Sequence, residues 1–202
     1  MDPVNFDDLL AFILVGFALT GSPGPATLSL AATGAAYGFR AGRNYLLGLL
    51  LGVMMVIIGV GAGIFAAIIA VPAAAKALTV FATAYIGYLA FKIATAPPVG
   101  KPVSMTDGPG FISGVILNIS NPKAYAAFAA LFSGFHLIPE APTRSIILQI
   151  FLCFAIICIV NPAWLYAGSA LRNVLRNEKT SRRVNRGFAV VLVASVLLTV
   201  LL

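Results

Sequence analysis

The sequence predicts an all-α, polytopic membrane protein, and three observations lead to this fold class. Of the 202 residues, 60% are hydrophobic and only 9% are charged, and the mean hydropathy is +1.01. Six apolar segments approach or exceed the roughly 20 residues that a helix needs to cross a bilayer. Basic residues gather in the short connections between these segments, which is a topology signal and not a nucleic-acid-binding pattern. A soluble helical protein of this length could not bury so much apolar sequence.

The membrane helices are expected at these six segments. In chain order they are Leu9 to Tyr37, Asn44 to Ala70, Ala73 to Thr95, Gly110 to Phe135, Ser145 to Leu171, and Gly187 to Leu202. The last is short, and we expect Arg183 and Arg186 to snorkel to the membrane surface beside it. No connection is long enough for a second folded domain. Residues 1–202 are therefore expected to form one membrane domain.

The connections between the segments alternate in charge. Arginine and lysine dominate the first, third and fifth connections, whereas the opposite side has only Lys76 and Arg144, along with the acidic N-terminus and Glu140. By the positive-inside rule, the odd-numbered connections face the cytoplasm and both termini lie on the outer side. A cleaved signal peptide would start with basic residues, so the first segment is expected to remain as a membrane helix.

The first expected helix contains a stretch that should break it at membrane depth. Residues 22–25 read Ser-Pro-Gly-Pro, and the two prolines lack the N–H groups of an uninterrupted helix. The carbonyls of Leu19 and Gly21 therefore lose their helical partners. Irregular backbone within a membrane is tolerated only where protein or a water-filled cavity satisfies it. A simple kink is the alternative interpretation of this stretch.

The fourth expected helix is interrupted in a similar way at residues 120–123, Ser-Asn-Pro-Lys. Asparagine is a preferred N-cap and proline is preferred at the first helical position. A half-helix is therefore expected to begin at Pro122, with Asn121 as its cap. Its unsatisfied N–H groups would point into the break near the middle of the membrane.

Lys123 is a charged residue inside an apolar segment, where a charge costs about 3 kcal/mol. No aspartate or glutamate lies within the six segments, except at their edges. Because intramembrane charges are functional by default, a substrate carboxylate is the candidate partner. The alternative is that Lys123 only caps carbonyls freed by the breaks, such as those of Leu19 or Asn118.

A substrate site is expected where the two breaks meet. The half-helix N-termini after Pro25 and Pro122 would hold a carboxylate together with Lys123, and the carbonyls of Leu19, Gly21 and Asn118 would receive an ammonium group. The candidate substrate-binding residues are Ser22, Pro23, Gly24, Pro25, Thr27, Asn118, Asn121, Pro122 and Lys123. Four hydroxyl groups near the first break could line a polar path: those of Thr20, Ser22, Thr27 and Ser29. The alternative is that they bond locally to the backbone, as serine and threonine often do in helices.

Other polar or small residues are candidates for hinges, for cavity lining or for packing. A third break is considered at Asn161-Pro162 in the fifth segment, and its counterpart in the first half, on the same offset between the halves, is a glycine cluster in the second segment. Tyr85 could reach the cavity or belong to an aromatic belt. The hinge or cavity candidates are Gly59, Gly63, Tyr85, Asn161 and Pro162. Gly48-x-x-x-Gly52 has the spacing of a close helix contact, expected inside the bundle.

The two halves of the chain resemble each other weakly. A Pro/Gly-rich linker, residues 96–109, separates halves of about 1–100 and 108–202. Placing residues 16–26 over 114–124 matches four residues and superposes the two helix breaks. Because each half has three helices, the second half must enter the membrane in the opposite orientation to the first. This predicts two inverted repeats, with the site where broken helices 1 and 4 meet. Chance similarity between apolar helices is the competing interpretation.

Four motifs resemble the lysine exporter (LysE/RhtB) family of bacterial amino-acid efflux proteins. Residues 22–25 look like its first-helix signature, residues 38–42 (Gly-Phe-Arg-Ala-Gly) like the turn into its second helix, and residues 84–92 like its third helix. The closest match is Asn-Ile-Ser-Asn-Pro-Lys-Ala at 118–124, which resembles the fourth-helix signature. The resemblance covers essentially the whole chain. It implies export of amino acids or close derivatives across the bacterial inner membrane, driven by the proton gradient.

Two departures from the family pattern bear on substrate and coupling. The resemblance leads us to expect an acidic residue shortly after Gly52, but Val53-Met54-Met55 follows here. The family's Pro-Gln-Phe at the end of the fourth helix is replaced by Ser-Gly-Phe at 133–135. An obvious carboxylate for proton relay is thus missing, and nothing anionic in the bundle would hold a cationic side chain. A secondary exporter of neutral amino acids, working by alternating access, is the expected function.

Alternative functions predict other features. A metal or inorganic-ion exporter would need intramembrane Asp, Glu or His ligands. An intramembrane thiol redox carrier would use Cys153 and Cys158, which are five residues apart and are expected to be free and buried. A purely structural scaffold would not explain why a charged residue, Lys123, lies inside an apolar segment. Because there is no Ser/His/Asp triad, phosphate-binding loop or paired metal-ligand motif, no enzyme and no cofactor are expected. The expected partners are an amino acid and membrane lipid, with no nucleic acid; a homo-oligomer is compatible with the sequence.

Overall fold

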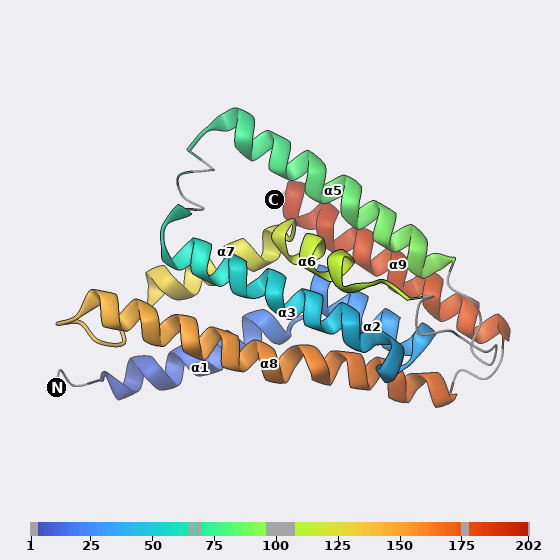
Figure 1. Cartoon of the computed structure of the whole chain (residues 1–202), viewed down its shortest axis with the longest axis horizontal. Coiled ribbons are helices and arrows are strands. Elements are labelled where there is room, and N and C mark those ends of the chain that lie inside the picture. Colours follow the sequence, from blue (N-terminus) through green and yellow to red (C-terminus); the bar gives the residue numbers. More distant parts are fainter. Residues whose placement is uncertain (1–3, 65–66, 68–69, 96–107, 175–177, 202) are drawn as a thin grey trace.

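The computed structural model describes residues 4–64, 67, 70–95, 108–174 and 178–201, and this part of the chain is helical without any strand (Figure 1). Its helices are α1 (Phe6–Gly21), α2 (Pro25–Tyr37), α3 (Phe39–Gly61), α5 (Pro72–Ala94), α6 (Phe111–Ile119), α7 (Pro122–Gly134), α8 (Pro142–Val174) and α9 (Glu178–Leu201). The all-α prediction is confirmed. Both expected interruptions are present, between α1 and α2 and between α6 and α7.

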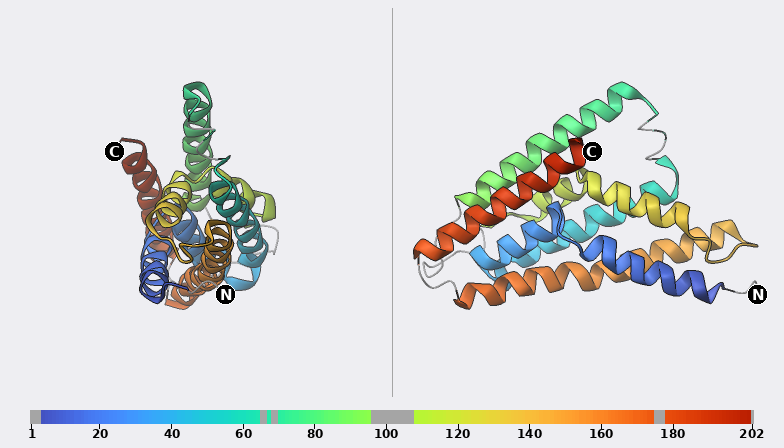
Figure 2. Two further views of the ribbon diagram at one scale, coloured as in Figure 1. Left: turned by 90° about the vertical axis from the view of Figure 1, so that its left-hand side faces the viewer. Right: turned by 180° about the vertical axis from the view of Figure 1, so that it is seen from behind.

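The helices run back and forth along one long direction (Figures 1 and 2). The pair α1 and α2 leads away from the N-terminus, α3 returns, and α5 leads away again; α6 with α7 returns, α8 leads away, and α9 turns back. The path therefore reverses direction after each expected membrane segment. The α5 and α9 helices lie side by side and lean away from α1 and α8 (Figure 2).

Three helices are long and apolar enough to cross a membrane: Phe39–Gly61, Pro72–Ala94 and Pro142–Leu171. The α1 and α2 pair passes the same criterion together, with a bend of 56° at the break, which raises the count to four among the described residues. The helices of the fourth expected segment, α6 and α7, are not among these candidates. The structure thus shows a multi-pass, apolar helical protein, while six spans arranged as inverted repeats stay a prediction.

Three expected boundaries or breaks are wrong. The second helix ends at Gly61 and not at Ala70, because Gly63 adopts a left-handed backbone with a φ of 75°, and its N–H bonds back to the carbonyl of Val60. The sixth helix starts at Glu178, so its arginines belong to the helix. The third break is absent, because Pro162 lies inside the continuous helix α8. Prolines are tolerated in membrane helices where neighbouring helices satisfy the freed carbonyl.

The closest helix contacts are made by glycines. On α3, a side chain at Gly48 would collide with the backbone carbonyl of Phe111 at the start of α6, and one at Gly52 would lie 2.7 Å from the Val115 carbonyl oxygen. Gly34 of α2 and Gly168 of α8 likewise meet each other's helix backbone. Small residues allow this approach. The contact expected from Gly48-x-x-x-Gly52 is therefore confirmed, and it lies within the bundle.

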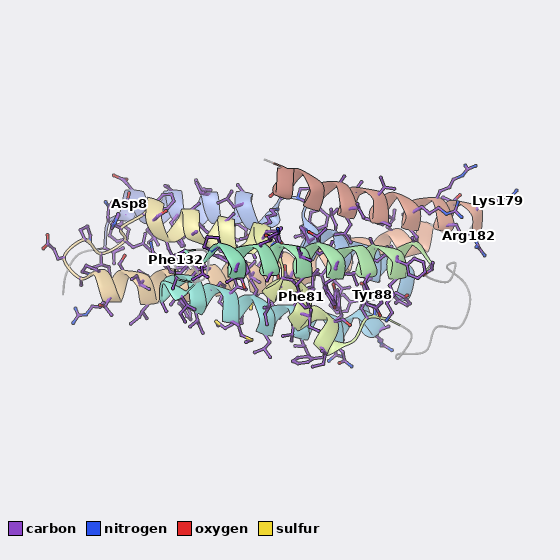
Figure 3. All side chains as sticks on the ribbon, turned by 90° about the horizontal axis from the view of Figure 1, so that it is seen from above. Asp8, Phe81, Tyr88, Phe132, Lys179 and Arg182 are labelled. Atoms are coloured by element: carbon purple, nitrogen blue, oxygen red, sulfur yellow. The ribbon has the colours of Figure 1, made fainter. Side chains whose placement is uncertain are left out.

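The two ends of the bundle differ in charge (Figure 3). Asp8 lies at the end that holds the N-terminus, whereas Lys179 and Arg182 lie at the opposite end. The first turn of α3, with Arg40, and the last turn of α5, with Lys92, reach the same basic end. Lys101 and Arg176 of the expected basic connections fall outside the described residues.

The two cysteines lie on different sides of α8. Cys153 is buried in an apolar cluster with Phe12 and Val53, whereas Cys158 is exposed. Five residues along a helix rotate a side chain by roughly 140° from its starting direction. The expectation that both thiols are buried is therefore wrong for Cys158, and the two thiols do not share a face.

Candidate functional site

The two helix breaks are joined by one side chain. Lys123, in the first turn of α7, donates hydrogen bonds from Nζ to the carbonyl oxygen of Ser22 at 2.7 Å, to the Ser22 hydroxyl at 2.7 Å and to the carbonyl oxygen of Pro23 at 3.1 Å. These acceptors form the break between α1 and α2. An ammonium group has three N–H donors, so the first break engages all of them.

This geometry agrees with the interpretation that Lys123 caps freed carbonyls, but the carbonyls are not the expected ones. Ser22 and Pro23 accept its bonds, in place of Leu19 or Asn118. The described residues provide no carboxylate within salt-bridge distance of the ammonium group. Its acceptors are all neutral, so dipoles solvate the positive charge of Lys123, which pairs with no acidic side chain in the part of the chain that the structure describes.

A cavity of about 40 Å³ lies beside this contact. Its polar lining residues are Thr20, Thr27, Asn118, Asn121, Lys123 and Asn161, and its lining also includes Leu19, Gly24, Ala26, Val53, Ala124, Ala127, Phe128 and Ile157. These residues come from α1, the first break, α2, α3, α6, the second break, α7 and α8. A cavity of this size holds a few water molecules, so an amino acid could enter only if the helices around it moved apart.

Most of the expected site residues gather at this cavity. Gly24, Thr27, Asn118, Asn121, Lys123 and Asn161 line it. Ser22 and Pro23 bind Lys123, while Pro25 and Pro122 begin the two half-helices. The other hinge or cavity candidates lie elsewhere. The Tyr85 hydroxyl donates to the Ser113 carbonyl at 2.7 Å, and a side chain at Gly59 would meet open space.

The carbonyls that were expected to receive a substrate ammonium are already occupied. Leu19 accepts from the Ser22 hydroxyl at 2.8 Å, and Asn118 accepts from the backbone N–H of Asn121 at 3.1 Å. Gly21 accepts from Nε1 of Trp164 at 3.1 Å. Local turns and a tertiary contact thus supply each of these carbonyls with one hydrogen-bond donor, and whether any of them receives a substrate ammonium stays a prediction. Trp164 had no distinguishing sequence signal; its role depends on α8 packing beside the break.

The hydroxyl groups near the first break bond locally. Thr20 donates to the Gly16 carbonyl at 2.7 Å, and Ser29 donates to the Ala26 carbonyl at 2.8 Å. Thr27 accepts from the N–H of Gly24 at 2.9 Å. This bonding to nearby backbone is the alternative that serine and threonine often follow in helices. Thr20 and Thr27 nonetheless have atoms at the cavity wall.

Asn121 does not cap α7 as expected. Its backbone has the extended conformation of an N-cap residue, with φ −87° and ψ 102°, but its side chain makes no capping hydrogen bond. The residue is 4% exposed, and its Oδ1 has no hydrogen-bond partner among the described residues. Asn118 is held differently, because its Nδ2 donates to the Leu49 carbonyl of α3 at 2.6 Å. The second break therefore contains one anchored amide and one unpaired amide oxygen.

An apolar helical bundle that passes repeatedly along one axis, with two interrupted helices that meet at a cavity, has the architecture of a membrane transporter. The chain belongs to the LysE type translocator family, whose model matches residues 17–201. The resemblance stated from the sequence is thus confirmed, and the family is one of transporters and not of enzymes. A comparison with curated protein sequences found no match, and a comparison with solved structures found none.

Replacing Gly24 by alanine is expected to displace Lys123. The Gly24 backbone is extended (φ −173°), a conformation open to any residue, but a Cβ would lie 2.6 Å from Cδ and 3.0 Å from Nζ of Lys123. The missing side chain therefore makes room for the lysine. We expect Gly24→Ala to lower the transport rate severalfold in reconstituted vesicles. Gly21→Ala is the control, because a Cβ there meets nothing within 4 Å; equal rates in the two variants would contradict the prediction.

Proposed function

We propose that this translocator is a secondary exporter of neutral amino acids, which it carries from the cytoplasm across the bacterial inner membrane by alternating access. The observation that supports this most directly is Lys123, a cation that joins two helix breaks and has only neutral acceptors. The family supports export of amino acids or similar small molecules across a membrane.

The carboxylate of the substrate would bind Lys123. A charge-assisted hydrogen bond is roughly twice as strong as a neutral one, so a carboxylate can compete with the carbonyl oxygens of Ser22 and Pro23 that now hold the ammonium group. When the carboxylate replaces these carbonyls, Lys123 no longer connects the second helix break to the first. Substrate binding would thereby loosen the contact between the two halves of the chain, as alternating access requires.

The side chain of the substrate would lie against an apolar wall. Val53, Phe128 and Ile157 line the cavity, and none of its lining residues is acidic. A cationic side chain would therefore be buried without an opposite charge, which is costly in a membrane protein. Val53 directly follows Gly52, in the region where the family resemblance leads us to expect an acidic residue. Neutral amino acids with apolar side chains fit this cavity best.

The proposed topology has six spans in two inverted three-helix repeats. In support, the chain reverses direction after each expected segment, and the first segment of each half is the broken one (Figure 1). The basic end of the bundle would face the cytoplasm by the positive-inside rule, which puts the N-terminus on the outer side. Coupling to protons is proposed from the family resemblance, with no carboxylate among the cavity lining residues to carry the proton.

Transport by purified protein in proteoliposomes tests this function. We expect radiolabelled leucine, alanine or another neutral amino acid to accumulate by counterflow when the same amino acid is loaded inside, whereas lysine and glutamate should not. An imposed pH gradient should increase net transport if protons are coupled. Counterflow of lysine but of no neutral amino acid would refute the substrate class.

A further inference from the structure

An α-amino acid carries an ammonium group as well as a carboxylate, and this cation also needs an acceptor in the cavity. The three carbonyls freed by the helix breaks each already accept one hydrogen bond, from Ser22, Trp164 or the backbone of Asn121, so none of them is an unpaired acceptor. Burying an ammonium group without hydrogen bonds is unfavourable. The acceptor that gains most from an ammonium group is one that is buried, unpaired and part of a residue at the cavity wall.

Asn121 meets these three conditions. The residue is 4% exposed and is one of those that line the cavity, and its Oδ1 is buried and lacks a partner among the described residues. A buried amide oxygen left without a hydrogen bond costs roughly 1–3 kcal/mol. Native proteins rarely retain such a group without a reason. The extended backbone at Asn121 would also have allowed a capping bond to α7, and the side chain does not make one.

We propose that Oδ1 of Asn121 accepts a hydrogen bond from the α-ammonium group of the substrate, while Lys123 binds the α-carboxylate. Two residues that flank Pro122 would then recognise both charged groups of an amino acid. This inference rests on the proposed function and extends it, because it makes Asn121 the residue that distinguishes amino acids from carboxylic acids without an amino group.

The other buried polar groups fit this role less well. The amide of Asn118 is anchored to the Leu49 carbonyl. The hydroxyl of Thr27 accepts from the N–H of Gly24. Two other buried side chains have unpaired atoms, Thr33 and Asn185, but neither residue lines the cavity. Asn185 therefore serves as a matched control: it is also a buried asparagine with an unpaired amide atom, and it lies on α9.

The test compares leucine with its deaminated analogue, 4-methylpentanoate, by isothermal titration calorimetry on the purified full-length protein. We expect the wild type to bind leucine at least roughly tenfold more tightly, the magnitude of one hydrogen bond to a charged group. In Asn121→Ala this preference should disappear while affinity for 4-methylpentanoate stays the same. Asn121→Asp, which retains an acceptor oxygen, should keep the preference, as should Asn185→Ala.

Three results would overturn the inference. The first is an Asn121→Ala protein that still prefers leucine as the wild type does. The second is an Asn121→Ala protein that loses both ligands while Asn121→Asp and Asn185→Ala keep them, because Asn121 would then support the whole site. The third is a wild type that binds both ligands equally. A wild type that binds neither leucine nor any other neutral amino acid would instead reject the proposed function itself.

Discussion

Replacing Lys123 by methionine is expected to abolish amino-acid export. Methionine is similar in length but has no N–H donor, so the bonds to Ser22 and Pro23 disappear along with the charge that would bind the substrate carboxylate. Losing an interaction with a buried charge typically costs 3–5 kcal/mol, or roughly a hundredfold or more in rate. We expect counterflow in proteoliposomes to fall to the level of empty vesicles.

Folding should survive this substitution, which separates a transport defect from a structural one. Methionine removes a charge that is itself costly in the membrane, and this gain offsets part of the lost hydrogen bonding. Lys76→Met is the matched control, because Lys76 is exposed on α5 and does not line the cavity at the helix breaks. Transport by Lys123→Met at the rate of Lys76→Met would mean that Lys123 only joins the breaks and does not bind substrate.

Replacing Gly48 by leucine is expected to prevent α3 from packing against α6. Even a Cβ at this position would overlap the backbone carbonyl of Phe111, and a backbone cannot move aside as a flexible side chain can. The helices would have to separate, and Asn118 would lose its 2.6 Å hydrogen bond to the Leu49 carbonyl. We expect a loss of several kcal/mol in stability, at the upper end for overpacking, seen as poor recovery of monodisperse protein in detergent.

Gly59→Ala, on the same helix, provides the comparison. A Cβ at Gly59 meets nothing within 4 Å, and alanine favours a helix by up to about 1 kcal/mol over glycine. Its melting temperature should therefore equal or exceed that of the wild type. The same variant tests whether Gly59 acts as a hinge, since a stable protein with slow transport would support that role. A Gly48→Leu protein as stable as Gly59→Ala would show that the helices separate easily.

The sequence by itself determined the features that depend on local chemistry. Apolar segments must be helical in a membrane, because only helices and closed barrels satisfy their backbone there. The prolines at 23, 25 and 122 predict where two helices stop, since a proline lacks the N–H that continues the helix. Lys123 stood out because a charge inside an apolar segment needs a partner. These predictions required no knowledge of which helices pack together.

Predictions from the local sequence were wrong where a neighbouring helix supplied a hydrogen-bond donor or a packing partner. Pro162 has the same preceding asparagine as Pro122, yet α8 continues through it between neighbouring helices. The carbonyl of Gly21 was expected to be free, but Trp164 approaches from 143 residues further along the chain and donates to it. Such contacts depend on distances between helices, which no local pattern contains.

The tertiary structure alone decided how the two breaks interact. It placed Lys123 on the carbonyls of Ser22 and Pro23 and supplied each freed carbonyl with a donor. It also left Asn121, a residue that lines the cavity, with a buried and unpaired Oδ1. The physical reason is that hydrogen-bond satisfaction in a buried site is settled by every group within about 3 Å. Sequence therefore identified the residues at the breaks, and packing determined which of their polar atoms have hydrogen-bond partners within the protein.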